Sequence, residues 1–370
     1  MKIVLVEPFF SGSHQTWAEA FQQFSKHDVH ILSLKGRHWK WRMIGGAVSL
    51  AKKFMDLAFK ADLLLVTDML DLNSFLGLTR KKTAGIPVAI YFHENQITYP
   101  WSPEDQDIPL KRNHQYGFIN YTSALAADVV LFNSEFHKTS FLNGLNNFLR
   151  QFPDEKNLEN IDIIKNKTRV LPLGLSLKRF LKFKNKIKKQ DVPILLWNHR
   201  WEYDKNPVLF FETLFRLKEE GIDFKLVVLG DAYQKQPKIF SMAKEKLKAQ
   251  TLHFGFVNNF ETYAQWLWQA DILPVTSHQD FFGGSVVEAI YCQCFPILPQ
   301  RLAYPEHIPE VCKSDVFYET DAVFYQKLKS ALVHPKGNSY NASLQNFVAQ
   351  YDWSTLASYY DLVFENIATT

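Results

Sequence analysis

Short apolar runs alternate with longer amphipathic stretches along the first half of the chain. A short run that is apolar at nearly every position is typical of a strand buried on both faces of a parallel sheet. The stretches between the runs place their apolar residues at helical spacing. The pattern predicts strands at 2–6, 29–34, 62–67, 87–92 and 128–133, and helices at 14–25, 48–60, 113–127 and 134–149.

The same alternation starts again after residue 192. It predicts strands at 193–197, 224–229, 252–254, 271–275 and 295–298, and helices at 207–220, 237–249, 259–270 and 283–292. Two further helices are expected between 340 and 369, separated near Asp352. Because strands alternate with helices throughout, the fold class is expected to be α/β, with parallel sheets joined by right-handed crossovers.

A basic segment at 178–190 separates the two alternations. It carries seven Lys or Arg residues and no acid. A chain of 370 residues is also too long for a single hydrophobic core. We therefore predict an N-terminal Rossmann-like domain at 1–177, a basic linker at 178–191, a C-terminal Rossmann-like domain at 192–345, and C-terminal helices at 346–370 that cross back to the first domain.

Composition indicates an ordinary globular protein. Apolar residues make up 46% of the chain and charged residues 22%, and the net charge of +4 argues against a uniformly basic nucleic-acid binder. The three cysteines argue against a disulfide framework and for a reducing compartment. No signal peptide and no apolar run of roughly 20 residues is evident, so we expect a cytoplasmic protein without stable membrane association.

The most informative segment runs from Ser277 to Glu288, between a predicted strand and the helix that follows it. Asp280 and Glu288 lie eight residues apart across a turn that contains Gly283, Gly284 and Ser285. Ligands of open α/β sheets bind at this end of the strands, and a helix N-terminus offers N–H groups to phosphate. Two carboxylates suit sugar and ribose hydroxyls, but a helix-capping acid beside an unrelated surface Glu fits the spacing equally well.

A second loop at the same expected sheet edge carries Arg200 and Lys205. A guanidinium and an ammonium group there suit a diphosphate, whose departure needs charge neutralisation when no metal is present. The alternative is a pair of solvated loop cations. No GxxxxGK[ST] phosphate loop and no GxGxxG after the first strand is present.

These motifs resemble those of the retaining GT-B glycosyltransferases, and within them the tRNA-queuosine α-mannosyltransferases. The resemblance spans nearly the whole chain. It rests on Ser11-Gly12-Ser13-His14, Arg37-His38-Trp39-Lys40-Trp41-Arg42, Phe92-His93-Glu94-Asn95-Gln96, Asn133-Ser134, His199-Arg200-Trp201-Glu202-Tyr203-Asp204-Lys205, Phe281-Phe282-Gly283 and Glu288-Ala289-Ile290-Tyr291-Cys292. It implies two Rossmann-like domains whose parallel sheets face across a cleft.

The resemblance also implies roles for individual residues. Glu288 matches the acid that holds the nucleotide ribose, and Asp280 matches the acid that contacts donor-sugar hydroxyls, where many relatives carry Glu. The remaining matches are the diphosphate clamp Arg200 and Lys205, the backbone nest Gly283, Gly284 and Ser285, the first-loop Gly12, and His93, which faces the donor sugar.

The same resemblance implies transfer of mannose from GDP-mannose to queuosine in the anticodon of a tRNA, with retention at the anomeric carbon and no enzyme nucleophile. Two alternatives stay open: a GT-B enzyme that acts on a lipid or small molecule, and a non-catalytic nucleotide- or RNA-binding protein. We expect no cofactor beyond the nucleotide-sugar donor.

No metal is expected either. Asp105-Gln106-Asp107 has the Asp-x-Asp pattern of metal-dependent transferases, but it stands in a Pro-flanked polar segment rather than after a strand. We interpret it as a solvated loop. His93 has a structural alternative, which is to cap the sheet by hydrogen bonds, and His14 and His278 are weaker candidates.

Contacts with tRNA are expected from two basic stretches and one strand end. Residues 35–42 interleave cations with tryptophan, which suits phosphate contact and base stacking, so we predict that Arg37, Trp39, Lys40, Trp41 and Arg42 bind RNA. The linker at 178–190 adds a second cationic surface. Asn133 either contacts the acceptor or, with Ser134, caps the next helix. Ordinary solvated loops and an anionic membrane remain alternatives, although neither basic stretch reads clearly as a helix.

Overall fold

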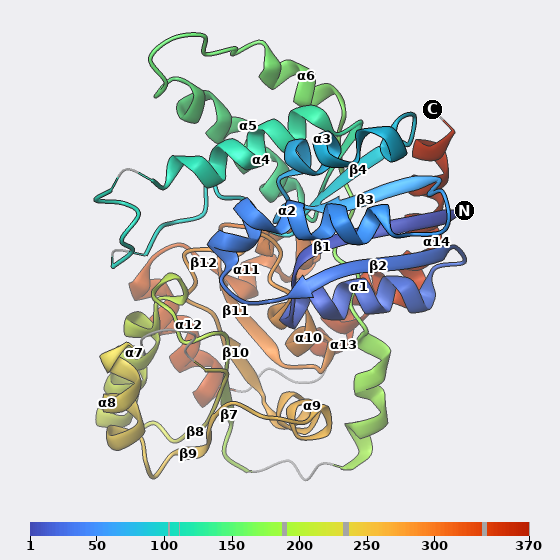
Figure 1. Cartoon of the computed structure of the whole chain (residues 1–370). Coiled ribbons are helices and arrows are strands. Elements are labelled where there is room, and N and C mark those ends of the chain that lie inside the picture. Colours follow the sequence, from blue (N-terminus) through green and yellow to red (C-terminus); the bar gives the residue numbers. More distant parts are fainter. Residues whose placement is uncertain (103, 111, 187–190, 232–236, 335–338, 370) are drawn as a thin grey trace. The chain divides into compact units, whose positions relative to one another are not determined.

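The computed structural model describes residues 1–102, 104–110, 112–186, 191–231, 237–334 and 339–369. The chain divides into two compact units. The N-terminal unit comprises Met1–Leu175 together with Trp353–Thr370, and the C-terminal unit comprises Ser176–Asp352. The two units are described separately below (Figure 1).

The N-terminal unit is built on a six-stranded parallel sheet with the order β2-β1-β3-β4-β5-β6. Its elements are β1 (Lys2–Phe10), α1 (Gly12–Phe24), β2 (Asp28–Lys35), α2 (Trp39–Met55), β3 (Leu63–Thr67), α3 (Leu72–Thr83), β4 (Val88–Phe92), α4 (His114–Ala126), β5 (Val129–Phe132), α5 (Glu135–Leu149), α6 (Asn160–Asn166), β6 (Thr168–Val170) and the C-terminal α14 (Trp353–Ala368).

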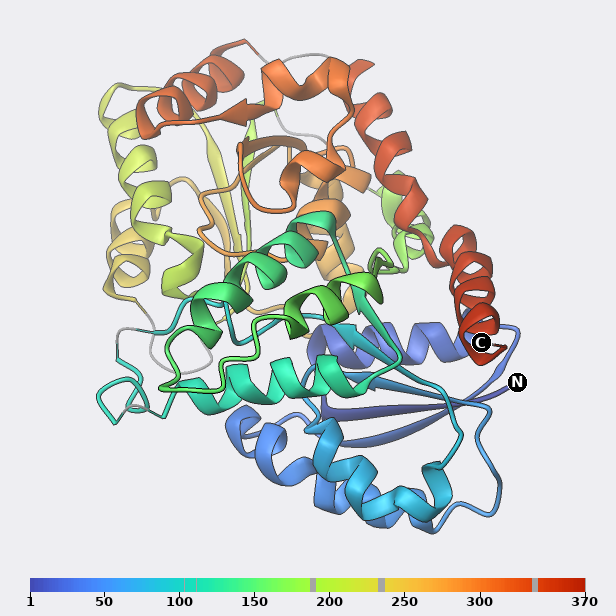
Figure 2. The same ribbon diagram turned by 90° about the horizontal axis from the view of Figure 1, so that it is seen from above.

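Helices cover both faces of this sheet. Helices α2 to α6 pack on one face, where alternate strand residues such as Val4, Leu64 and Phe132 meet Phe54 and Phe141 in one core. Helix α1 packs against α14 on the other face of the sheet, and Figure 2 shows the blue α1 and the red α14 with the strands running across the view. The segment from residue 353 on therefore belongs to the N-terminal unit, although it follows the whole C-terminal unit in sequence.

The C-terminal unit is also built on a six-stranded sheet, with the order β12-β11-β10-β7-β8-β9. Its elements are the 3₁₀ helix η1 (Leu177–Lys186), β7 (Ile194–Asn198), η2 (Tyr203–Lys205), α7 (Pro207–Glu219), β8 (Lys225–Leu229), α8 (Lys238–Lys246), β9 (Thr251–Gly255), α9 (Phe260–Gln269), β10 (Ile272–Pro274), α10 (Gly284–Tyr291), β11 (Phe295–Pro299), η3 (Tyr304–His307), η4 (Glu310–Cys312), α11 (Lys313–Val316), β12 (Phe317–Tyr318), α12 (Asp321–Val333), α13 (Ser339–Val348) and η5 (Ala349–Tyr351).

The parallel sheets confirm the predicted α/β class, but two predicted features differ, and helices α3, α6 and α12 and strands β6 and β12 were not predicted. Helix α2 begins at Trp39 rather than at residue 48, so the tryptophan-rich basic stretch opens a helix. The described part of the expected linker is the 3₁₀ helix η1, which lies within the C-terminal unit. Asp71 caps α3 by accepting a hydrogen bond from the Ser74 N–H.

Candidate functional site

Lys205 is the centre of a buried charge cluster at the carboxyl ends of β7 and β10. Its Nζ lies 3.0 Å from Asp280 Oδ1 and 3.2 Å from Asp204 Oδ2, and it also donates to the Gln279 carbonyl oxygen. Burial alone would lower the pKa of Lys205, but the two carboxylates outweigh it and raise that pKa. The cation therefore stays charged and fixes the loop on which Asp280 stands.

Asp280 is held from both sides. Its second oxygen, Oδ2, accepts a hydrogen bond of 2.5 Å from the Tyr304 hydroxyl. Burial acts to raise the pKa of Asp280, but Lys205 and its other neighbours lower it overall. Tyr304, which lies 24 residues along the chain, was not singled out from the sequence. The predicted contact of Asp280 with donor-sugar hydroxyls stays a prediction.

The turn before α10 requires glycine at Gly283. Its φ of +83° is left-handed, and a Cβ there would lie 3.0 Å from the Tyr304 ring. Gly283 is the N-cap residue of α10, and Gly284 and Ser285 form the first turn, with no side chain capping it. The backbone N–H groups at this helix start are thus suited to a phosphate, and their contact with the donor stays a prediction.

Glu288 is fixed by hydrogen bonds one turn further along α10. Its Oε2 accepts from the Tyr263 hydroxyl at 2.7 Å, and Asn198 donates to both that hydroxyl and the Ser285 carbonyl oxygen. Its Oε1 lies 3.6 Å from an Arg179 guanidinium nitrogen. Burial raises the pKa of the Glu288 carboxyl, whereas Arg179 and Tyr263 act to lower it. Asn198, Tyr263 and Arg179 were all missed as members of this site.

Arg200 differs from Lys205 in being open to solvent. Its side chain is 43% exposed, and its Nη1 lies 3.7 Å from Glu202 Oε2. The two predicted clamp cations therefore stand in different surroundings. Lys205 is compensated inside the protein, whereas Arg200 presents its charge at the surface of the loop after β7.

In the N-terminal unit, the His93 ring contacts a buried ion pair formed by Glu7 and His14. Glu7 Oε2 and His14 Nδ1 are 3.0 Å apart, and the His14 and His93 rings have centroids 4.2 Å apart. Burial acts to lower the pKa of His14, but Glu7, aided by Asp68 and Glu94, raises it to about 9. Burial and the His14 charge push the pKa of His93 well below its ordinary value. A charged His14 thus supports a neutral His93.

His93 is anchored at the end of β4 by its backbone. Its N–H donates to Asp68 Oδ1 at 2.8 Å, and its carbonyl oxygen accepts from Asn133 Nδ2 at 2.9 Å. Asn133 Oδ1 also lies 2.9 Å from His137 Nδ1. The Asn133 side chain is therefore used to join the ends of β4 and β5, and its contact with an acceptor stays a prediction. Gly12, with φ +53°, begins α1 close along the chain to His14.

Glu7, His14 and His93 are also the group of possible metal ligands found in the described part of the chain. One ligand atom from each lies within 4.8 Å of the others. Glu7 and His14 already neutralise each other, and the His14 and His93 rings are tilted by only 38° across their contact. In this geometry the His93 ring packs against the ring of His14, which is itself paired with Glu7.

The basic, tryptophan-rich stretch at the start of α2 is divided between partly buried and exposed residues. Trp39 packs with Trp101 and Tyr116, and Lys40 Nζ lies 2.6 Å from both Asp105 Oδ1 and Asp107 Oδ2. The Asp-x-Asp segment is therefore an ion-pair partner of α2 rather than a freely solvated loop. The remaining three predicted residues differ: Trp41 is 60% exposed, Arg37 is exposed, and Arg42 Nε donates to the Lys35 carbonyl oxygen.

The basic segment after residue 177 packs against α9. Phe180 is fully buried, and its carbonyl oxygen accepts from Trp268 Nε1 at 2.8 Å. Lys182 is exposed, and Lys184 Nζ lies 5.1 Å from the centre of a Trp268 ring. The part of the predicted linker at 187–190, and the side chain of Lys186, lie outside the described residues.

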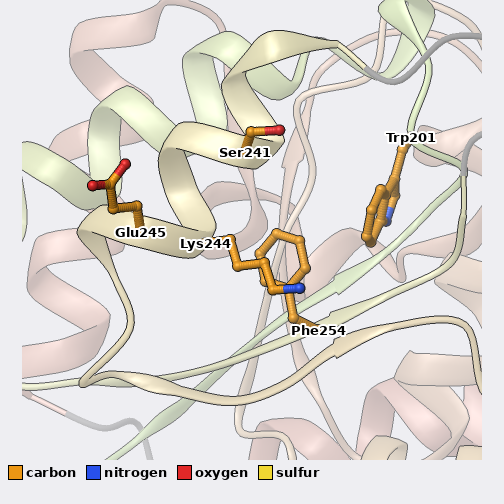
Figure 3. A pocket seen from close by; sticks show the side chains of 5 residues that line it. All are labelled: Trp201, Ser241, Lys244, Glu245 and Phe254. Carbon is orange, nitrogen blue, oxygen red and sulfur yellow. The ribbon is translucent and has the colours of Figure 1, made fainter.

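A pocket in the C-terminal unit lies apart from these clusters. It is lined by Trp201, Ser241, Lys244, Glu245 and Phe254. Figure 3 shows Lys244 beside the Phe254 ring, with Trp201 across from them. None of the predicted site residues lines this pocket, so it is assigned no part in the site.

Comparison with known proteins identifies relatives of both units. Residues 2–175 match the family described as tRNA-queuosine alpha-mannosyltransferase N-terminal, and residues 178–310 match glycosyl transferases group 1. A tRNA-queuosine alpha-mannosyltransferase from Drosophila melanogaster is 36% identical over 335 residues, which cover 88% of this chain and 85% of that protein.

Solved structures agree on the fold. A sucrose-phosphate synthase from Thermosynechococcus elongatus superposes with a TM-score of 0.73 at 13% identity, covering 99% of each chain. HepE from Anabaena, in complex with UDP and glucose, superposes with a TM-score of 0.67 at 12% identity, covering 99% of this chain and 100% of that one. These likenesses confirm the predicted GT-B fold. No helix in the described residues has the length and apolar character needed to cross a membrane.

Proposed function

The chain belongs to the tRNA-queuosine alpha-mannosyltransferase family, and on that premise we propose that it transfers mannose from GDP-mannose to queuosine in a tRNA anticodon. It is a glycosyltransferase. The observation that carries the proposal is the pair of fixed carboxylates, Asp280 and Glu288, at one sheet edge beside Lys205 and Arg200. That arrangement offers hydroxyl acceptors and cations to a nucleotide sugar.

The proposed reaction keeps the configuration of the sugar. A hydroxyl oxygen of queuosine forms a bond to the anomeric carbon on the face from which the diphosphate leaves. The bond between that carbon and the diphosphate oxygen breaks, and a diphosphate oxygen takes the proton of the acceptor hydroxyl. GDP carries away the electron pair. Arg200, Lys205 and the start of α10 stabilise this charge, so the protein acts by positioning and electrostatics.

The proposal is tested by incubating the purified chain with GDP-mannose and tRNA that contains queuosine. Mass spectrometry of the digested nucleosides should show one added hexose on queuosine and none on tRNA that carries guanosine at that position. UDP-glucose and UDP-galactose serve as competing donors. Hexose transfer to a lipid or small molecule, with none to tRNA, would overturn the acceptor and leave the glycosyltransferase assignment intact.

Transfer is expected to continue in excess EDTA. The cations of the donor loops are Lys205 and Arg200, and the Asp-x-Asp pair of Asp105 and Asp107 is already engaged with Lys40. Protein cations supply the charge that a metal supplies in other transferases. The measurement is the initial rate with EDTA and then with Mn²⁺ or Mg²⁺ restored. Loss of activity that the metal restores would contradict a protein-only diphosphate clamp.

Replacing Trp41 by alanine is expected to lower transfer to tRNA by about tenfold, because base stacking on an exposed aromatic contributes roughly 1–3 kcal/mol. Stacking is uncharged, so the dependence of tRNA affinity on salt should hardly change.

Arg37→Ala should instead make tRNA affinity less sensitive to salt. The slope of log affinity against log salt concentration should become shallower by up to about 0.9 if one phosphate contact is lost. Transfer is measured at several salt concentrations.

Val48→Ala is the matched control for Trp41→Ala. Val48 lies on the same helix and is 61% exposed, so its loss removes apolar surface without removing a ring. Trp39→Ala does not serve as a test of stacking, because Trp39 packs with Trp101 and Tyr116. Equal losses for Trp41→Ala and Val48→Ala would argue against a stacking role.

A further inference from the structure

The 3₁₀ helix η1 brings one cation of the basic segment to the proposed donor site. Phe180 anchors η1 against α9, through its contact with Phe260 at 4.8 Å between ring centres and through the Trp268 hydrogen bond to its carbonyl oxygen. Asp352 Oδ2 accepts a hydrogen bond from the Lys178 N–H at the start of the same helix. The backbone beside Arg179 is thus fixed within the C-terminal unit.

Arg179 is held between an aromatic ring and an acid. Its guanidinium carbon lies 3.8 Å from the centre of the Phe260 ring, and a terminal nitrogen lies 3.6 Å from Glu288 Oε1. Its Nε is buried and has no hydrogen-bond partner among the described residues. The position of this side chain is therefore set by stacking and by the Glu288 charge.

Glu288 needs such a partner because it is a buried acid. Tyr263 donates to its Oε2 at 2.7 Å, which leaves Oε1 facing Arg179. Among the described residues, the charged and titratable groups that face the carboxylate are Arg179 from η1, Tyr263 from α9 and Cys292 from α10. Arg179 is the cation of this group, and together with the Tyr263 hydrogen bond it opposes the effect of burial on the ionisation of Glu288.

We infer that Arg179 is a positioning residue of the donor site, which keeps Glu288 ionised and aims its Oε1 at a ribose hydroxyl of a nucleoside diphosphate sugar. This rests on the proposed function, in which Glu288 holds the ribose. Arg179 acts through Glu288 rather than through the diphosphate. It belongs to the stretch interpreted from sequence as a linker that contacts tRNA.

The inference predicts that loss of Arg179 weakens GDP binding, and that the size of this loss depends on pH and on the presence of the ribose hydroxyls. Without the Arg179 cation, the pKa of Glu288 should rise further, so the carboxylate should be protonated at a higher pH than in the unchanged protein. GDP affinity of Arg179→Gln should be roughly tenfold lower than that of the unchanged protein at the acidic end of the pH range and should recover as the pH rises. Arg179→Lys, which keeps the charge, should restore most of the affinity at the lower pH.

Binding is measured on the full-length chain by isothermal titration calorimetry with GDP and with 2′,3′-dideoxy-GDP. The dideoxy nucleotide lacks the hydroxyls that Glu288 would bind, so its affinity for the unchanged protein should be low. Its affinity for Arg179→Gln should be equally low, because the variant loses only an interaction that this nucleotide cannot make. Arg216→Gln is the matched control. Arg216 stacks on Tyr325 at 3.7 Å and pairs with Glu220 at 3.1 Å, in the last turn of helix α7, and its loss should leave GDP affinity unchanged.

Several outcomes would overturn the inference. Unchanged GDP affinity of Arg179→Gln at every pH would remove Arg179 from the site. An equal loss for GDP and for the dideoxy nucleotide would place its action away from the ribose, and a loss shared by Arg216→Gln would show a general defect of folding. If the unchanged protein bound neither GDP nor UDP, the proposed function would fail instead, since that result does not involve Arg179.

Discussion

Replacing Lys205 by methionine is expected to abolish donor binding and to destabilise the C-terminal unit. Methionine fills a similar volume but leaves the Asp204 and Asp280 carboxylates, 3.2 and 3.0 Å away, without their buried counter-charge. Removing one partner of a buried charge pair costs about 3–5 kcal/mol. The free energy of unfolding is measured by chemical denaturation, and GDP binding by calorimetry.

Comparison of Lys205→Met with Arg200→Ala separates an effect on donor binding from an effect on the stability of the C-terminal unit. Because the Arg200 side chain is 43% exposed, its removal should change the free energy of unfolding little. A lost charged contact to the diphosphate of roughly 1.5–3 kcal/mol should still weaken donor binding and transfer by about tenfold or more. Near-normal kinetics of Arg200→Ala would remove it from the site, and full stability of Lys205→Met would contradict the charge cluster.

The alternation of strands and helices was predictable because the central strands, such as β3 (LLLVT) and β4 (VAIYF), are apolar at nearly every position, whereas the short, polar edge strand β6 (TRV) was not predicted. The predicted ends of β4 (Val88–Phe92) lie close to the observed ones, since the strand was predicted at 87–92, whereas β1 was predicted to end at residue 6 and extends to Phe10. The start of α2 was missed because Gly45 and Gly46 interrupt the helical pattern, and the apolar face before them is carried by Trp39 and Met43. Intrinsic helix propensity is a weak guide to the start of a helix where tertiary packing determines it.

The residues that orient the site acids could not be found from motif spacing. Tyr304 lies 24 residues from Asp280, and Tyr263 lies 25 residues from Glu288, each on a different element from its partner. Such pairs form only when the sheet brings separate strand ends together. A signal did exist for η1, because Phe180 and Phe183 recur at the three-residue period of a 3₁₀ helix within the basic segment.

The charge pattern alone did not reveal how two groups of residues pack. The run of cations after residue 177 was interpreted as a basic linker that adds a cationic surface, whereas Phe180 is buried and Arg179 pairs with Glu288. Asp105 and Asp107 were expected to be solvated, yet they form one ion-pair cluster with Lys40, whose contact with RNA stays a prediction. Opposite charges far apart in sequence compensate each other in ways that a local pattern does not reveal.

Replacing Glu7 by glutamine is expected to lower the stability of the N-terminal unit in a pH-dependent way. Glu7 is fully buried, and the pKa of its partner His14 is raised to about 9 from the ordinary 6.5. A shift of this size corresponds to about 3 kcal/mol in favour of the folded state. Because the folded-state pKa is the higher one, this stabilisation is fully present below pH 6.5 and is lost as the pH rises through about 9.

The measurement is the melting temperature of the unchanged protein and of Glu7→Gln between about pH 6 and about pH 9.5. The difference between them should be largest at the lower pH and should shrink as His14 loses its proton. Asp68 and Glu94 also face His14, but they are present in both proteins, so their titration largely cancels from the difference. Glu19→Gln, which changes an exposed acid whose Oε1 accepts a hydrogen bond from Gln15 in the same unit, should show no such trend. A difference that is constant across this range would mean that His14 does not carry the charge that keeps His93 neutral.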